Sequence, residues 1–186
     1  MSANPQHDLK LEREMRLVEG AIQQARCRAA FKLVKQTDVQ LDDLQGHLMR
    51  FQPHTVHFSG HGDGAGSIVV MEDRKPISPP IDALYNLLAN LGEGVRLVVL
   101  NSCFSQPLAE RLAEVVDCVI GTGQAIEDEA AIAFASALYG GLAYGKSLHT
   151  AFGLGVNALD LRRYPGSAAP RLLTRQGIDA RRVCFC

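Results

Sequence analysis

The sequence predicts an α/β fold with a mostly parallel sheet and helices on both faces. Two observations support this. Segments of strand and helix character alternate along the 186 residues, as in sheets whose strands are joined by right-handed crossover helices. The hydrophobic run Val95–Leu100 is typical of parallel strands that are buried on both faces.

The composition predicts one globular domain in a reducing compartment. The length suits a single domain over 1–186, with a core of about 2–160 and a tail over 161–186. A net charge of -1 argues against a nucleic-acid surface. The sequence contains no apolar stretch of the ~20 residues that a membrane span needs, and no apolar leader. Five irregularly spaced cysteines favour the cytoplasm. No Cys-x2-Cys pair exists, and Cys184-x-Cys186 alone is a poor zinc half-site, so no metal is expected. No cofactor is expected either.

The first third of the chain predicts two helices and two strands. Hydrophobic residues at spacings of three and four predict the first helix, a short apolar run predicts a strand, and Thr37 with Gln40 forms a capping-box pattern that predicts the start of the second helix. Pro53 ends that helix. The residues concerned are Leu11, Met15, Val18, Ile22, Ala25 and Ala29 for the first helix, Phe31–Val34 for the strand, Leu41, Leu44 and Leu48 for the second helix, and Thr55–Phe58 for the next strand.

The rest of the chain continues the alternation. After a glycine-rich loop over Asp63–Ser67 we expect a short β-type run, and prolines exclude Pro76–Pro80 from a central strand. Pro80 suits the first turn of a helix. The further predicted helices carry Ile81, Leu84, Leu88 and Leu91, then Leu108, Leu112 and Val115, then Ala130–Leu142, and last about Ser147–Leu159; the further predicted strands are Ser67–Met71, Val95–Leu100, Cys118–Ile120 and, at the end of the tail, Val183–Cys186.

Two apolar runs stop at a reactive residue. The first ends at Ser59-Gly60-His61-Gly62 and the second at Asn101-Ser102-Cys103. Sites form at the carboxyl ends of parallel strands, so His61 and Cys103 can meet there as a nucleophilic pair. Taken singly, His61 is as readily a loop histidine, and a lone cysteine is more often a small buried hydrophobe. The glycines near His61 do not open a helix, which argues against a dinucleotide loop.

Together the two stretches resemble the caspase-like cysteine peptidases, and among them the CHAT family, whose catalytic core is similar to that of separase. The resemblance covers roughly Ser2 to Leu159 and implies a three-layer sandwich. Further segments that carry it are Ser2–Pro5, Leu9–Glu14, Cys118–Gly121, Ile126–Phe134 and Gly140–Ser147.

The resemblance implies a cysteine endopeptidase that uses a dyad. Cys103 would be the nucleophile and His61 the acid–base group, and the backbone N–H groups of Cys103 and Gly62 would bind the oxyanion. Family members often act in bacterial defence or regulated cell death. The expected partners are a protein substrate and a separate sensor protein, without nucleic acid or membrane.

The resemblance also suggests which residues line the substrate pocket. Caspases hold a substrate aspartate with arginines, one of them at the end of the first strand, where the matching region here is Ala3-Asn4. Asn101, two residues before Cys103, is polar but neutral. We therefore expect no aspartate requirement. If Asp128 faces the pocket, a basic or neutral residue is preferred; the equally weighted alternative is that Asp128 only caps its own helix.

Two other functions stay open, namely an inactive caspase-like interaction module and a different thiol hydrolase. The intact His61 and Cys103 favour the peptidase. In the family an apolar strand precedes the Ser2–Pro5 segment, and here Met1 comes directly before it. Three outcomes are then open: another chain or segment supplies the strand, the two neighbouring strands close the gap, or the start of the sequence is an artefact. Of these we expect that the chain recruits a partner strand, for example by self-association, with Val183–Cys186 as an alternative substitute.

Overall fold

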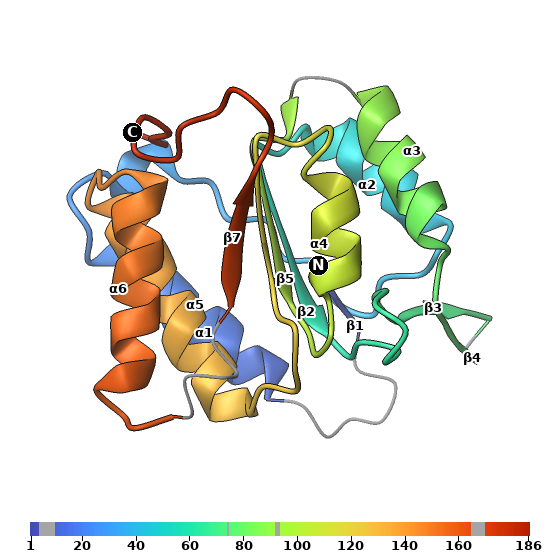
Figure 1. The fold of residues 1–186 in the computed structure, drawn as a ribbon, viewed down its shortest axis with the longest axis horizontal. Helices are drawn as coiled ribbons and strands as arrows, with labels where there is room; N and C mark the ends of the chain where they lie inside the picture. The colour runs from blue at the N-terminus through green and yellow to red at the C-terminus, as the bar shows by residue number, and fades with distance from the viewer. Residues whose placement is uncertain (4–9, 74, 92–93, 165–169) are drawn as a thin grey trace. The chain divides into compact units, whose positions relative to one another are not determined.

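The computed structural model describes residues 1–3, 10–73, 75–91, 94–164 and 170–186. The chain divides into two compact units, each built from several separate segments. The first unit contains the sheet, and the second contains the long helices α1, α5 and α6 (Figure 1).

The first unit is built on a five-stranded sheet of order β1-β2-β5-β6-β7 (Figure 1). The strands from β1 to β6 in this order pair in parallel, and β7 pairs with β6 in antiparallel orientation. The predicted α/β class with a mostly parallel sheet is therefore confirmed. The strands are β1 (Ser2–Ala3), β2 (Thr55–Gly60), β5 (Leu97–Asn101), β6 (Cys118–Gly121) and β7 (Arg171–Thr174).

The core of this unit explains why β5 lies at the centre of the sheet. All five residues of β5 are buried, as the continuous apolar run predicts. Helix α4 packs directly on the neighbouring β6: a Cβ on Gly121 would lie 2.7 Å from the Cβ of Ala109. The remaining elements of this unit are α2 (Asp43–Phe51), α3 (Ile81–Leu91), α4 (Gln106–Leu112) and a two-stranded hairpin of β3 (Val70–Glu72) and β4 (Lys75–Ile77).

The second unit is helical and is held together by close helix contacts. Helices α5 and α6 approach through glycines, because a Cβ on Gly155 would lie 2.7 Å from the ring of Phe134, and one on Gly141 would lie 3.0 Å from Ala151. The elements are α1 (Leu11–Gln23), the short 3-10 helix η1 (Arg28–Ala30), α5 (Asp128–Ala143) and α6 (Leu148–Asp160).

The predicted start of the second helix is wrong. Helix α2 begins at Asp43 rather than after Thr37, and Gln40 does not close a capping box. Instead Gln40 forms a β-bridge with Met71, and the N–H of Leu41 donates to the carbonyl of Met71 at 2.8 Å. Pairing with a residue that is distant in sequence has overridden the local capping pattern.

Two predicted strands are also wrong. Phe31–Val34 has no regular secondary structure, and its residues are half-buried or exposed, so β-type composition alone did not make a strand. Val183–Cys186 is irregular, and the chain around it forms hydrogen bonds with the start of α6 instead of joining a sheet. The carbonyls of Ala180 and Val183 accept from the N–H groups of His149 and Leu148, at 3.1 and 2.8 Å. These bonds satisfy donors in the first turn of the helix.

Candidate active site

The two stretches that the sequence singled out lie at the ends of neighbouring strands. Strands β2 and β5 pair in parallel with Ser59 opposite Asn101. His61 follows β2, and Ser102 and Cys103 follow β5. The structure therefore brings the two stretches to the same edge of the sheet, where α/β proteins form their sites.

Gly62 lies directly against the backbone of Cys103. A Cβ on Gly62 would lie 1.9 Å from the carbonyl oxygen of Cys103 and 3.5 Å from its nitrogen. Real Cβ atoms do not approach backbone so closely, so only glycine fits here. Gly62 and Cys103, which were expected to supply the oxyanion donors, are in contact.

The pairing around Gly62 leaves its N–H pointing away from the next segment of chain. Gly62 forms an antiparallel bridge with Ile68, and the two hydrogen bonds of this bridge come from the N–H groups of Asp63 and Val69, at 3.2 and 3.0 Å. In such a non-hydrogen-bonded pair, the N–H groups of the two paired residues point outward from the hairpin. The N–H of Gly62 thus has the orientation of a donor to something other than Ile68.

Asp63 shapes the loop that follows His61 and Gly62. Its Oδ1 atom accepts hydrogen bonds from the N–H groups of Ala65, Gly66 and Ser67, at 2.9, 2.8 and 2.9 Å. Partial burial acts to raise the pKa of Asp63, but these bonds, with one from Ser78, outweigh it and hold the pKa below its usual value. The carboxylate form of Asp63 therefore stabilises the loop.

The same loop is braced against the helix that follows Cys103. A Cβ on Gly66 would lie 2.5 Å from the Pro107 ring, and Gly66 has a φ of +107°, which favours glycine. The carbonyl of Gly66 accepts from the N–H of Leu108 at 3.2 Å. The loop after His61 and the start of α4 are thus fixed to each other.

Buried hydroxyls hold the turn that carries Cys103. The carbonyl of Ser102 accepts from Oγ1 of Thr122 at 2.6 Å and from Oγ of Ser105 at 2.9 Å. Ser105 Oγ also accepts from the N–H of Thr122 at 3.1 Å. The next residue, Phe104, has a φ of 56°, a left-handed conformation that needs support from its surroundings. The turn after β5 is therefore tied to the residues that follow β6.

The hydroxyl of Ser102 does not take part in this hydrogen-bond cluster. The Ser102 side chain is 2% exposed, and its Oγ has no hydrogen-bond partner in the part of the chain that the structure describes. The carbonyl of Ser102, rather than its hydroxyl, therefore anchors the turn.

Sequence reasoning did not identify Asp63, Ser105 or Thr122. The role of Asp63 could have been predicted from the sequence around it. An aspartate followed by glycines and a serine is typical of a loop in which the aspartate side chain accepts hydrogen bonds from the following backbone N–H groups. Ser105 and Thr122 lie on segments that only the parallel sheet brings together, so their hydrogen bond could not be predicted from the residues next to either of them.

The predicted pocket residues have different outcomes. Asn4 lies outside the described residues. Asn101 is the last residue of β5 and is 7% exposed. Asp128 belongs to the second unit and is the first residue of α5. Its role as a pocket residue stays a prediction.

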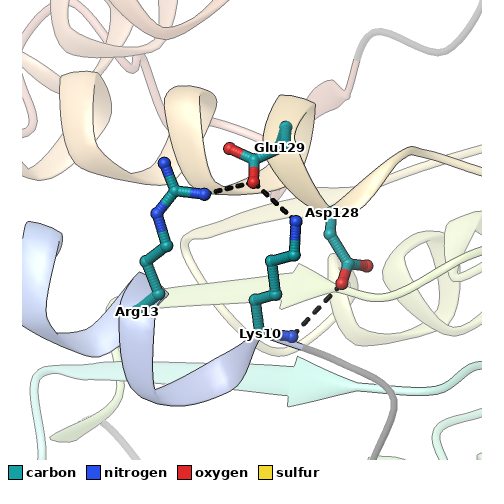
Figure 2. A network of polar contacts seen from close by, with 4 residues as sticks. All are labelled: Lys10, Arg13, Asp128 and Glu129. Atoms are coloured by element: carbon teal, nitrogen blue, oxygen red, sulfur yellow. Dashed lines mark hydrogen bonds and ion pairs between the residues drawn. The ribbon is translucent and has the colours of Figure 1, made fainter.

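In the second unit Asp128 supports a neighbouring helix. Figure 2 shows its carboxylate accepting a hydrogen bond, at 3.2 Å, from the N–H of Lys10, the residue before α1. Beside it Glu129 pairs with the side chains of Lys10, at 2.8 Å, and of Arg13. The hydrogen bond from Lys10 and the nearby positive charges lower the pKa of Glu129. Asp128 therefore caps α1, whereas the sequence suggested a cap for its own helix.

Among the cysteines of the first unit, only Cys103 is partly exposed. Cys118 is buried in β6. Burial, with the charge of Asp117, raises the pKa of Cys118 to about 11, although Arg96 opposes the shift. Cys118 is therefore a poor candidate for a nucleophile at neutral pH.

Metal-ligating side chains and apolar helices were the two remaining features of interest among the described residues. Within them, no three histidine, cysteine, aspartate or glutamate side chains gather in a way that could hold a metal ion. No helix in the described ranges is both long enough and apolar enough to cross a bilayer.

The comparisons with known proteins identify a family. The model of the CHAT domain family matches residues 3–159. No curated protein sequence matches the chain. Among solved structures, the chain is similar to a secreted C11 cysteine protease from Bacteroides thetaiotaomicron, determined in complex with an irreversible peptide inhibitor. Identity is 17% and the TM-score 0.46, and the match covers 69% of this chain and 36% of that one.

Proposed function

Because the chain belongs to the CHAT domain family, we propose that it is a cysteine endopeptidase with Cys103 as nucleophile and His61 as acid–base group. The observation that carries the proposal is the contact of Gly62 with the backbone of Cys103 at the ends of two adjacent parallel strands.

The proposed reaction proceeds through a thioester. The thiolate of Cys103 attacks the carbonyl carbon of the scissile peptide bond, and the N–H groups of Cys103 and Gly62 donate to the oxyanion. His61 then gives its proton to the leaving amine as the C–N bond breaks. In the second half, His61 takes a proton from a water molecule, whose oxygen attacks the thioester and releases the acid product and the thiolate.

The outward N–H of Gly62 supports its assignment as an oxyanion donor. The bridge to Ile68 does not use this N–H, since its two bonds come from Asp63 and Val69. An oxyanion hole works because such donors are fixed before the reaction begins. The Asp63 hydrogen bonds and the contact of Gly66 with Pro107 support that fixed geometry.

The proposed substrate is a protein, and the proposed setting is bacterial defence or regulated cell death under a separate sensor protein. We expect no requirement for aspartate before the scissile bond. Asn101, at the end of β5, has no charge with which to bind an aspartate side chain.

A map of cleavage sites across a proteome, comparing wild type with Cys103→Ala, tests this proposal. Cys184→Ala is the matched control, since it makes the same change at an exposed cysteine. We expect cleavage with wild type and with the control and none with Cys103→Ala, and the mapped sites should show no aspartate requirement. Cleavage that survives Cys103→Ala would overturn the assignment.

A thiol-reactive peptide probe separates the two alternatives. A peptidase incorporates the probe at Cys103 in a time-dependent reaction, and mass spectrometry locates it. Labelling of Cys103 without any proteolysis would favour a different thiol hydrolase. If neither labelling nor proteolysis occurs, the inactive interaction module becomes the better explanation.

A further inference from the structure

Two thiols of the second unit, neither of them proposed for catalysis, share one small space. A Cβ on Gly145, in the turn between α5 and α6, would lie 3.6 Å from the Sγ atoms of both Cys27 and Cys186. The same point lies 3.5 Å from a guanidinium nitrogen of Arg26. The Cys27 and Cys186 side chains are hydrogen-bonded to each other. All five cysteines lie in the described part of the chain, and none forms a disulfide.

Each of the two cysteines is anchored separately to the end of α5. The N–H of Cys27 donates to the carbonyl of Ala143 at 2.9 Å, and the thiol of Cys186 donates to the carbonyl of Leu142 at 3.6 Å. The tail that carries Cys186 is also bonded to the first turn of α6 through Val183. The two thiols are therefore held as neighbours by independent contacts rather than by one flexible end.

We propose that Cys27 and Cys186 are an oxidant-responsive dithiol that closes to an intramolecular disulfide when a peroxide is present. The bond would join the segment after α1 to the tail across the turn at Gly145. This proposal does not depend on the proposed peptidase function, because it uses neither His61 nor Cys103.

The chemistry balances with hydrogen peroxide as the oxidant. One thiolate attacks a peroxide oxygen, which gives a sulfenic acid and hydroxide, and the hydroxide takes up the proton that the thiol lost. The second thiol then attacks the sulfenic sulfur, and the S–S bond forms as water leaves. In total, two thiols and one peroxide give one disulfide and two waters. A thiol reductant reverses the bond by exchange.

The hydrogen bond between the thiols predicts how the rate depends on pH. This bond, with burial, raises the pKa of Cys186 to about 11, and Arg26 opposes the shift. The thiolate is the reacting form, and below a pKa of about 11 its fraction rises about tenfold per pH unit. Closure that starts from the Cys186 thiolate should therefore be about 100-fold faster at pH 9 than at pH 7. The disulfide should then restrict the unfolded chain and raise Tm by roughly 5–10 °C.

Peroxide treatment of the full chain, followed by alkylation and non-reducing peptide mapping, tests the proposal. The expected product is a Cys27–Cys186 cross-linked peptide from monomeric protein, which disappears with dithiothreitol. Cys184→Ser should keep the cross-link, and Cys186→Ser should abolish it together with the rise in Tm. Cys103→Ala should form it unchanged, so a failed peptidase assignment leaves this test intact.

Other products would overturn the proposal. These are a disulfide through Cys184, disulfides between two chains, or over-oxidation of Cys27 and Cys186 without a bond between them. If Cys186→Ser fails to fold, the wild-type map decides alone, because it requires no variant.

Discussion

Gly62 contacts the carbonyl of Cys103 so closely that a Cβ methyl group added at Gly62 would lie 1.9 Å from that oxygen. This contact joins the ends of β2 and β5, and any larger residue must push the two loops apart. The proposed nucleophile and one proposed oxyanion donor therefore depend on a single glycine.

Gly62→Ala should lower kcat/KM at least ~100-fold, because a displacement of about 1 Å is enough to misplace reacting groups. We also expect a loss of about 1–3 kcal/mol in the free energy of unfolding, from overpacking. Peptide hydrolysis and urea denaturation measure the two effects. Gly46→Ala, in α2 with open space around its Cβ position, is the control and should change neither quantity adversely. Full activity in Gly62→Ala would argue against the oxyanion role.

Cys103 should be the only cysteine that catalysis requires. Cys103→Ala should abolish proteolysis while it leaves Tm nearly unchanged, since the side chain is only partly buried. In the folded protein at pH 7, iodoacetamide should modify Cys103 much faster than Cys118, whose pKa is about 11. Mass spectrometry of timed samples gives both rates. Faster labelling of Cys118 than of Cys103 would contradict this.

His61→Ala should reduce kcat by ~10²–10⁴-fold, because both general acid–base catalysis and activation of the thiolate are lost. Alanine at His54, His57 or His149 should leave kcat close to that of wild type, although His57 lies within β2 and its loss should lower Tm. Kinetics and thermal melts on the four variants provide the comparison. Equal losses of kcat in all four, at unchanged stability, would count against the dyad.

Thr122 should affect the reactivity of Cys103 indirectly, because its hydroxyl holds the turn that carries Cys103. Thr122→Val keeps the shape but removes the 2.6 Å hydrogen bond to the Ser102 carbonyl, and we expect about 1–2 kcal/mol less stability and ~10-fold slower alkylation of Cys103. Thr122→Ser keeps the hydroxyl and should restore the alkylation rate. Ser102→Ala removes a buried hydroxyl that has no partner in the described residues, so it should be neutral or stabilising. If Val and Ser at position 122 behave alike, the hydroxyl is not the anchor.

Asp63 should make the stability of the protein depend on acid pH. Its pKa is lowered in the folded state, so its contribution is fully present above the unfolded value of 3.8 and is lost as pH falls through the folded pKa. Asp63→Asn should cost about 1 kcal/mol at pH 7, a modest figure because the carboxyl is exposed to solvent. Urea unfolding at pH 7 and near pH 3 measures this cost. A cost that is equally large at both pH values would show that charge plays no part.

Local patterns were sufficient to predict the elements that place the candidate site. The run Val95–Leu100 covers β5 except for its last residue, Asn101, and the run Thr55–Phe58 forms the first four residues of β2. Both strands were predictable because buried strands are rich in hydrophobic, β-branched and aromatic residues. Once the two strands were predicted, His61 and Cys103 were predicted to lie just after their carboxyl ends.

Contacts between distant segments could not be predicted in the same way. Gln40 pairs with Met71 instead of capping a helix, and Val183 accepts from the first turn of α6 instead of joining a sheet. Asp128 was expected either to face the pocket or to cap its own helix, but its carboxylate accepts from the N–H of Lys10, which is 118 residues away along the chain. In each case the local preference was weaker than a contact that only the folded chain provides.

The antiparallel strand β7 shows that the family match and the folding unit end at different places. The match stops at residue 159, whereas Arg171–Thr174 pair with all four residues of β6. A version of the chain that ends at Leu159 would leave β6, a buried and hydrophobic strand, paired with β5 on one side and unpaired on the side where β7 now lies. Such an uncovered edge is a template for intermolecular β-pairing, so this truncation should produce insoluble aggregates rather than a smaller soluble domain.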